Sequence, residues 1–492
     1  MFKKFMLNCR QVSQHFEWIL LGSVLLLLAM FIGVIWANSH PSWETWQINY
    51  YRSQVVQLDR KIMATQNPVL RGDLEQQRKN MKGKQPEIRS LTLPNGTVER
   101  CQTCHLGIEE ISDSHPTETF GCVVCHGGNA LSLDQDQAHA GMYGAGHPGQ
   151  LEVSQLSCGS QNSNGQCHSG HARSEDNQVD LVPTSLMANK GGELSMVRYM
   201  RGLDVSPKIS VKSGGTASQV PTPLNGQPLE QNLQHNCLEL CHQSKGKLPW
   251  LDSSANGCES CHVLTNWNHT YQGQDVTIPK SEVGHGLTHR LTTQIPFTQC
   301  NQCHNQGMPD LYNIQFKARP DLARVKVSSG PNQESLDDRL QNAYQPGMVF
   351  TQCEVELDCI DCHTRQDVMG DGHLYAWEYQ TVKIQCFDCH GTKKTTPAAR
   401  TVSSLDDLAF EEEQVNPNFP RLKIGDQLLK TAKGEELPYI RRDAEGWVLN
   451  SKVKGERYLI PLVNGSACQQ DPKRQTSNDC HKCHDVSGNL VK

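Results

Sequence analysis

Seven segments of the chain have two cysteines separated by two residues and followed directly by a histidine. In this pattern the thiols can form thioether bonds to the vinyl groups of a porphyrin, and the histidine can bind its iron. Zinc sites and redox motifs also use Cys-x-x-Cys, but neither requires the adjacent histidine. The pattern predicts covalent haem c at CQTCH from 101, CVVCH from 122, CESCH from 258, CNQCH from 300, CIDCH from 359, CFDCH from 386 and CHKCH from 480.

Two further Cys-His pairs have a first cysteine that is displaced along the chain. Cys237 precedes Cys241 in CLELCH, and Cys158 precedes Cys167 in CGSQNSNGQCH. The Cys-His pair must keep its relation to the iron, whereas the first cysteine only has to reach the other vinyl group. The inserted GSQNSNGQ is typical of a loop. A disulfide between Cys158 and Cys167 is the alternative, but every Cys-His here has an upstream cysteine, which favours haem.

These motifs predict nine haem c groups, and at least seven. The expected thioether cysteines are Cys101, Cys104, Cys122, Cys125, Cys158, Cys167, Cys237, Cys241, Cys258, Cys261, Cys300, Cys303, Cys359, Cys362, Cys386, Cys389, Cys480 and Cys483. The expected proximal iron ligands are His105, His126, His168, His242, His262, His304, His363, His390 and His484.

The sixth position of each iron separates an electron carrier from an enzyme. A supply of ten further histidines for nine positions favours bis-histidine haems that carry electrons and bind no substrate. Surface or structural roles are the alternative for any one of these histidines, and methionines such as Met142 and Met308 are alternative ligands. The candidate distal ligands are His115, His139, His147, His171, His235, His269, His285, His289, His373 and His481.

The N-terminus holds a long apolar run. Residues 18–37 have no charge and no proline, and Lys3, Lys4 and Arg10 precede them. This pattern predicts a transmembrane signal-anchor over 15–40 with the N-terminus in the cytoplasm. A cleaved signal peptide is the alternative. The expected location is therefore the bacterial inner membrane, as a single-pass protein with its haem region on the periplasmic side.

Composition constrains the fold class. Only 37% of residues are apolar and 6% aromatic, so porphyrins must supply much of the core. We expect a mostly α and irregular, haem-cored fold with one N-terminal transmembrane helix and a small β element near 401–467. The formal charge of −6 disfavours nucleic acid as a partner.

The spacing of the motifs suggests how the chain is organised. A helical pattern with apolar residues such as Tyr51, Leu58 and Ile62 follows the anchor and stops at Pro68. Residues 205–233 are rich in Pro, Gly and Ser and read as a linker. The expected order is a cytoplasmic tail (1–14), the anchor (15–40), a helical stalk (41–100), three haems (101–204), the linker, five haems (234–400), a haem-free β-rich insertion (401–467) and a last haem motif (468–492).

Three cysteines remain outside the motifs. Cys9 precedes the apolar run and is expected to be an ordinary thiol. A disulfide between Cys353 and Cys468 is the prediction for the other two, with unpaired burial as the alternative.

The segments RCQTCHLGIEE, His115-Pro116, FGCVVCHGG and QAHAG resemble membrane-anchored multihaem c-type cytochromes of bacterial respiratory chains. The resemblance implies electron transfer between a membrane quinol-oxidising or cytochrome module and periplasmic or extracellular redox proteins. It also implies that His115 and His139 are distal ligands of early haems. The alternatives are a multihaem oxidoreductase of the nitrite reductase or hydroxylamine oxidoreductase type, with one open haem, and a quinol dehydrogenase.

The haem count tests this reading of the cysteines. The mass of the intact protein should correspond to nine covalent haems, and Cys158→Ala should remove one thioether bond. A native mass that accounts for seven haems would show that the two stretched motifs do not bind haem.

Overall fold

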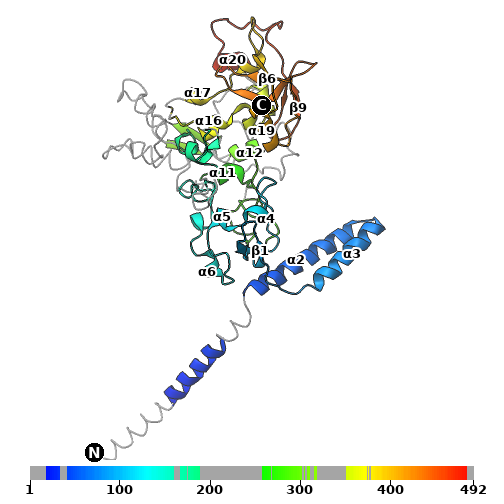
Figure 1. Cartoon of the computed structure of the whole chain (residues 1–492), viewed down its shortest axis with the longest axis vertical. Coiled ribbons are helices and arrows are strands. Elements are labelled where there is room, and N and C mark those ends of the chain that lie inside the picture. The colour runs from blue at the N-terminus through cyan, green and yellow to red at the C-terminus, as the bar shows by residue number, and fades with distance from the viewer. Residues whose placement is uncertain are drawn as a thin grey trace, which may run out of the picture. The chain divides into compact units, whose positions relative to one another are not determined.

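The computed structural model describes residues 18–33, 42–159, 167–173, 176–188, 257–266, 269–301, 304, 307–310, 315–318, 351–373, 375 and 378–484. The chain divides into two compact units. The first comprises Met1–Ile108, Gly128–Ala140 and Gln274–Thr277, and the second comprises Glu109–Gly127, Gly141–Gly273 and Ile278–Lys492. Figure 1 colours the elements of both units by residue number. The predicted linker over 205–233 lies outside the described residues.

The predicted transmembrane helix over 15–40 is wrong. Within the described part of the chain, no helix is both long enough and apolar enough to cross a membrane. The residues described in this region, 18–33, are helical. The single-pass inner-membrane location and the membrane attachment were inferred from this helix. The same finding contradicts them.

Two antiparallel helices follow in the first unit, α2 (Ser42–Ala64) and α3 (Pro68–Lys82). The first helix ends at Ala64. Pro68 is the first residue of the second helix, where its fixed φ and missing N–H are tolerated. Asn67 caps this helix by accepting hydrogen bonds from the N–H groups of Val69 and Leu70 at 3.0 and 3.3 Å. Leu58, Ile62 and Leu74 are buried between the two helices.

Helix α2 also holds the chain next to the first haem motif. The buried Gln47 side chain donates to the carbonyls of Glu87 and Thr103 at 2.7 and 2.8 Å, and Thr103 lies inside CQTCH. The Tyr50 ring lies against Gly107, which has a φ of +88°. A Cβ at this glycine would be 2.2 Å from the ring, so both the conformation and the close approach require glycine.

The remaining elements before the C-terminal sheet are short. In the first unit they are β1 (Leu91–Thr92), β2 (Val98–Glu99), η1 (Cys101–Thr103) and α6 (Gln135–His139). In the second unit they are α4 (Thr117–Phe120), α5 (Val123–His126), η2 (Tyr143–Gly146), α7 (Gln178–Leu181), η4 (Val182–Thr184), α11 (Glu259–His262), α12 (Phe297–Cys300), β3 (Gly307–Asp310), β4 (Gln315–Ala318), α14 (Gln352–Glu356), α15 (Cys359–Cys362), α16 (Arg365–Met369), α17 (Glu378–Thr381) and α18 (Cys386–His390).

A five-stranded antiparallel sheet forms the C-terminal part of the second unit. Its strands follow chain order: β5 (Ala399–Thr401), β6 (Gln427–Lys430), β7 (Glu436–Arg442), β8 (Trp447–Asn450) and β9 (Arg457–Leu459). Helix α19 (Leu408–Val415) connects the first two strands, and α20 (Ser477–His484) follows the sheet. The alternating segment 401–467 thus forms most of this sheet, whose first strand begins two residues earlier.

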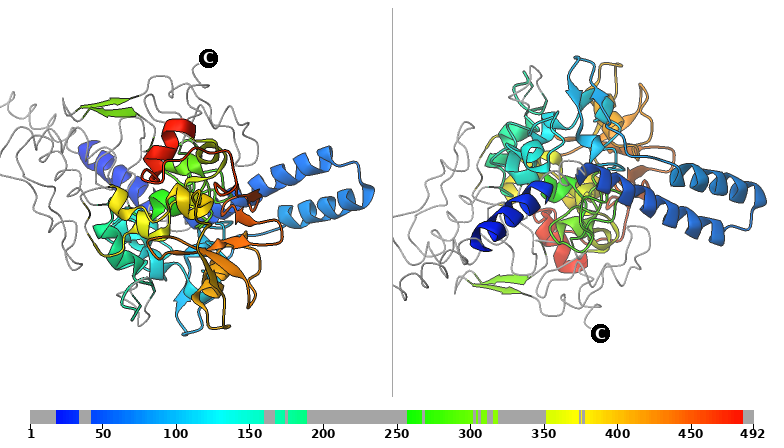
Figure 2. Two further views of the ribbon diagram at one scale, coloured as in Figure 1. Left: turned by 90° about the horizontal axis from the view of Figure 1, so that it is seen from above. Right: turned by 90° about the horizontal axis from the view of Figure 1, so that it is seen from below.

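Both faces of this sheet are covered. Leu428 and Leu429 are adjacent on β6 and both are fully buried, yet they belong to different apolar clusters, and a register shift separates them. Leu428 packs with α19, whereas Leu429 packs with Ile440 and with the motif cysteines Cys362 and Cys389. Figure 2 shows the strands, in orange, beside the short yellow helices that carry these cysteines.

The sheet core generates a stability prediction. Ile440 is completely buried, whereas Leu459 on β9 is 59% exposed. We expect Ile440→Ala to lower the free energy of unfolding by about 2–5 kcal/mol, and Leu459→Ala by less than about 0.5 kcal/mol. Urea denaturation followed by circular dichroism measures both. Equal effects of the two substitutions would contradict the packing described for the sheet.

Candidate functional site

The Cys-x-x-Cys-His motifs share one backbone turn. In five of them the histidine N–H donates to the carbonyl of the first cysteine, at 2.8–3.0 Å. This bond closes one helical turn, which brings residues i, i+3 and i+4 to the same side. The two thiols and the imidazole of each motif can therefore face one porphyrin. The five bonds start at His105, His126, His262, His304 and His363. Helices α18 and α20 contain the last two motifs.

The stretched motif at 158–168 closes in the same way. The N–H of His168 donates to the carbonyl of Cys158 at 3.0 Å, although six more residues separate them than in a regular motif. Ser169 adds a hydrogen bond to the carbonyl of Gly159 at 3.0 Å. Cys158 and Cys167 are both free thiols, so the alternative of a disulfide between them is not what the structure shows. Of the other expected site residues, His235, Cys237, Cys241, His242 and Cys303 lie outside the described residues.

The histidine rings are oriented by hydrogen bonds at Nδ1. His105 Nδ1 lies 2.8 Å from the Asp275 carboxylate and 2.9 Å from the Thr277 hydroxyl. The acceptors elsewhere are of several kinds, from carboxylates and hydroxyls to an amide and backbone carbonyls. Among the described histidines, those with a polar partner at Nδ1 include His105, His115, His147, His168, His262, His289, His363, His373 and His390.

Two candidate distal ligands have the opposite orientation. His171 directs Nε2 to the carbonyl of Cys167, and His481 directs Nε2 to the Glu354 carboxylate at 3.0 Å. The nitrogen that usually binds haem iron is thus engaged by protein at these two positions.

Three pairs of rings have centroids about 6 Å apart, and each combines a motif histidine with a candidate distal histidine. The ring centroids are 6.0 Å apart for His105 and His139, and 5.8 Å for His126 and His289. They are 6.1 Å apart for His168 and His115. The pair at His105 lies in the first unit, and the other two pairs lie in the second.

The other candidates are placed differently. His147 is joined to Glu259, inside the motif at 258, at 3.3 Å. His269 is buried and has a φ of +48°, and its carbonyl accepts the N–H of His285. His373 lies beside Asp371 at 3.3 Å.

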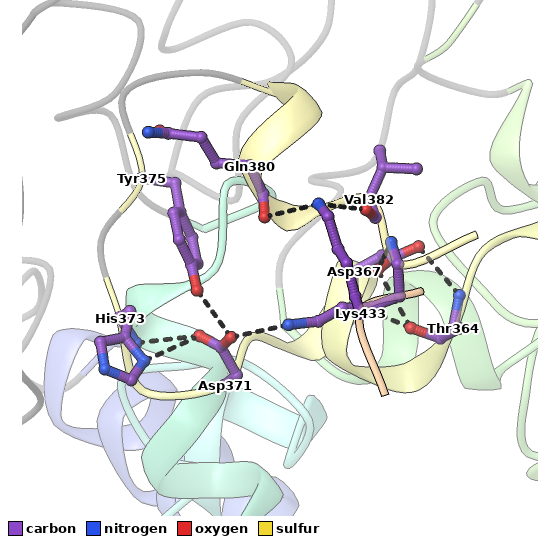
Figure 3. A network of polar contacts seen from close by, with 9 residues as sticks. Thr364, Asp367, Asp371, His373, Tyr375, Gln380, Val382 and Lys433 are labelled. Carbon is purple, nitrogen blue, oxygen red and sulfur yellow. Dashed lines mark hydrogen bonds and ion pairs between the residues drawn. The ribbon is translucent and has the colours of Figure 1, made fainter. Parts of the chain in front are cut away.

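Figure 3 shows the polar network around His373. Asp371 also accepts hydrogen bonds from the Tyr375 hydroxyl at 2.8 Å and from Lys383 Nζ at 3.1 Å. Asp367 caps helix α16 through Thr364, and its carboxylate lies 3.5 Å from Nδ1 of His363. Helix α16 and the residues directly after it therefore contact both a motif histidine and a candidate distal histidine.

First cysteines of different motifs meet in the second unit. Cys158 is hydrogen-bonded to Cys258, Cys300 to Cys359, and Cys386 to Cys480. Each contact joins motifs that are separate in the sequence. Haem groups bound to the two members of such a pair would be attached at adjacent points.

Burial and neighbouring groups shift several pKa values. The hydrogen bond from Cys258 lowers the pKa of Cys158 to about 7, whereas burial raises that of Cys389 to about 12. Burial, with the charge of His168, lowers the pKa of His115. Burial also lowers the pKa of His105, but the hydrogen bond and charge of Asp275 outweigh it and raise the pKa overall. A neutral His115 suits metal binding, because only the neutral ring has a lone pair to donate.

The predicted disulfide between Cys353 and Cys468 is not formed, since both are free thiols. Cys353 packs with Cys362 and Cys389 against the core of the sheet and lies 3.2 Å from the Thr351 hydroxyl. Cys353 therefore fits the alternative to the disulfide, which was unpaired burial.

The groups that orient the histidines were missed by sequence reasoning. Asp275, Thr292 and Pro461 supply acceptors at Nδ1 from 170, 30 and 71 residues away. No family model, no curated protein and no solved structure matches the chain.

Proposed function

We propose that this chain is a multihaem c-type electron-transfer protein that carries about nine haems and exchanges electrons with redox protein partners. The observation that supports this most strongly is the set of three histidine pairs. A metal–imidazole bond is about 2 Å long, so two axial imidazoles on one iron have ring centres about 6 Å apart. The measured separations of 5.8–6.1 Å match this value.

The hydrogen bonds at Nδ1 support the same proposal. An acceptor at Nδ1 keeps the ring proton there, which leaves the Nε2 lone pair available for a metal. His105, His115, His168 and His289 all have this arrangement. In the proposal, His139, His289 and His115 are the distal ligands of the haems at 101, 122 and 158.

Filled axial positions favour electron transfer over catalysis. Haem c, when bound, supplies a one-electron redox centre. The chain's own residues attach it through two thiols, bind both faces of the iron and exclude other ligands. The three contacts between first cysteines of different motifs support close spacing of successive haems, which electron transfer requires.

Electron paramagnetic resonance tests the proposed ligands. The oxidised native protein should show low-spin signals, and carbon monoxide should scarcely change the reduced spectrum. His139→Ala and His289→Ala should each create one high-spin signal without loss of haem, because the thioether bonds still hold it.

His171→Ala is the matched control, since its Nε2 is engaged by a backbone carbonyl, and it should leave the spectrum low-spin. If His171→Ala opened a site while His139→Ala did not, the assignment of ligands would be wrong. A strong high-spin signal in the native protein, with turnover of nitrite or hydroxylamine, would replace the proposal with an enzymatic function.

A further inference from the structure

Two successive haem motifs carry an aspartate before their second cysteine, Asp361 in CIDCH and Asp388 in CFDCH. Each uses one carboxylate oxygen within its own motif. Asp361 Oδ2 accepts the N–H of Asp358 at 3.1 Å, and Asp388 Oδ2 accepts the N–H of Gln385 at 2.8 Å. These bonds close a capping box at the start of α15 and of α18, which stabilises the helical turn that carries the thiols.

The second oxygen of each aspartate binds the five-stranded sheet. Asp361 Oδ1 accepts the N–H of Lys452, just after β8, at 2.7 Å. Asp388 Oδ1 accepts the N–H of Ala432, in the turn between β6 and β7, also at 2.7 Å. The two aspartates are 1% and 5% exposed, so water does not compete for these bonds. The same side chain thus joins a motif turn to the sheet at two places.

Each motif has additional bonds to the sheet. Tyr439 on β7, 2% exposed, donates its hydroxyl to the carbonyl of Asp361 at 3.0 Å. Lys452 Nζ lies 4.0 Å above the Tyr439 ring, a cation–π contact. Lys433, next to Ala432, donates to the carbonyls of Gln380 and Val382 at 3.1 and 2.6 Å, as Figure 3 shows.

The segment after β9 holds the proximal histidine of the second motif. The carbonyl of Pro461 lies 2.8 Å from Nδ1 of His390, and the N–H of Val463 donates to the carbonyl of His390 at 2.9 Å. A carbonyl at Nδ1 fixes the tautomer and the orientation of the ring, and such partners tune the bound metal.

We propose that the haem-free sheet positions the two haems at 359 and 386 and thereby sets their reduction potentials, with Asp361 and Asp388 as positioning residues. This inference rests on the proposed function. Haem potentials depend on hydrogen bonding around the ligands and on solvent exposure, and the sheet is hydrogen-bonded to both motifs. Its contacts reach the turn of each motif and the proximal ring of one.

The experiment compares substitutions at the two aspartates in the full-length haem protein. Asp361→Ala and Asp388→Ala remove both the cap and the bond to the sheet, whereas Asp361→Asn and Asp388→Asn keep an oxygen that can accept the sheet N–H. A spectroelectrochemical titration should show a shifted midpoint potential for one haem in each alanine variant, with a changed low-spin resonance signal. The asparagine variants should lie close to the native protein.

Asp443→Ala is the control. Asp443 lies in the β7–β8 turn of the same sheet, where it binds the N–H groups of Glu445 and Gly446 and the Arg457 side chain. Its loss should leave all potentials unchanged. Native potentials and native resonance signals in both alanine variants would overturn the inference, as would equal shifts in Asp443→Ala.

Two measurements separate this inference from the proposed function. Peptide mapping of the native protein must find haem on the peptides that contain Cys359 and Cys386, and its absence there would refute the proposed function itself. Amide hydrogen exchange needs no variant: the N–H groups of Ala432 and Lys452 should exchange as slowly as those of the sheet core. Exchange at the rate of exposed turns would refute the inference even if an alanine variant did not fold.

Discussion

If the chain binds haem as proposed, each ligating imidazole must divide its two nitrogens between a protein partner and the metal. A neutral ring has one N–H donor and one lone pair, so an acceptor at Nδ1 leaves Nε2 for coordination. The chain meets this requirement with unrelated groups: a buried carboxylate at His105, an amide at His168, and backbone carbonyls at His262 and His390. The acceptor's chemistry varies while its position relative to the ring does not. Orientation of the ring is therefore the property that these surroundings share.

Sequence reasoning located the elements whose signals are local. The Cys-x-x-Cys-His motifs and the β element near 401–467 both depend on neighbouring residues. The acceptors at Nδ1 could not be predicted, because they come from segments as distant as 170 residues. The transmembrane helix was wrong for another reason: it was inferred from the hydropathy of the run alone, whereas no described helix is long and apolar enough to cross a membrane. Ten histidines likewise matched nine vacancies in number, yet His171 and His481 differ from the others only in ring orientation.

The buried apolar side chains are distributed unevenly among the described residues. Of the five apolar side chains among the largest fully buried ones, four belong to strands of the C-terminal sheet: Leu428, Leu429, Leu437 and Ile440. This sheet has an ordinary hydrophobic core on both faces, and motif cysteines complete one of them. The segment without Cys-x-x-Cys-His motifs thus has the side-chain core that composition led us not to expect. The motifs at 359 and 386 adjoin this core.

In the motif at 158–168, the hydrogen bond from His168 to Cys158 closes the turn although the two cysteines are further apart in sequence than in a regular motif. In Cys-x-x-Cys-His, the two residues between the cysteines are part of the helical turn, so their number fixes its geometry. Here one backbone bond closes the turn while the length of the intervening chain is free to change. The entropic cost of closing a loop grows slowly, by about 0.6 kcal/mol for each doubling of its length. In the proposed haem site, the interval between Cys158 and Cys167 is consequently the part of the motif whose length is least tied to the position of His168.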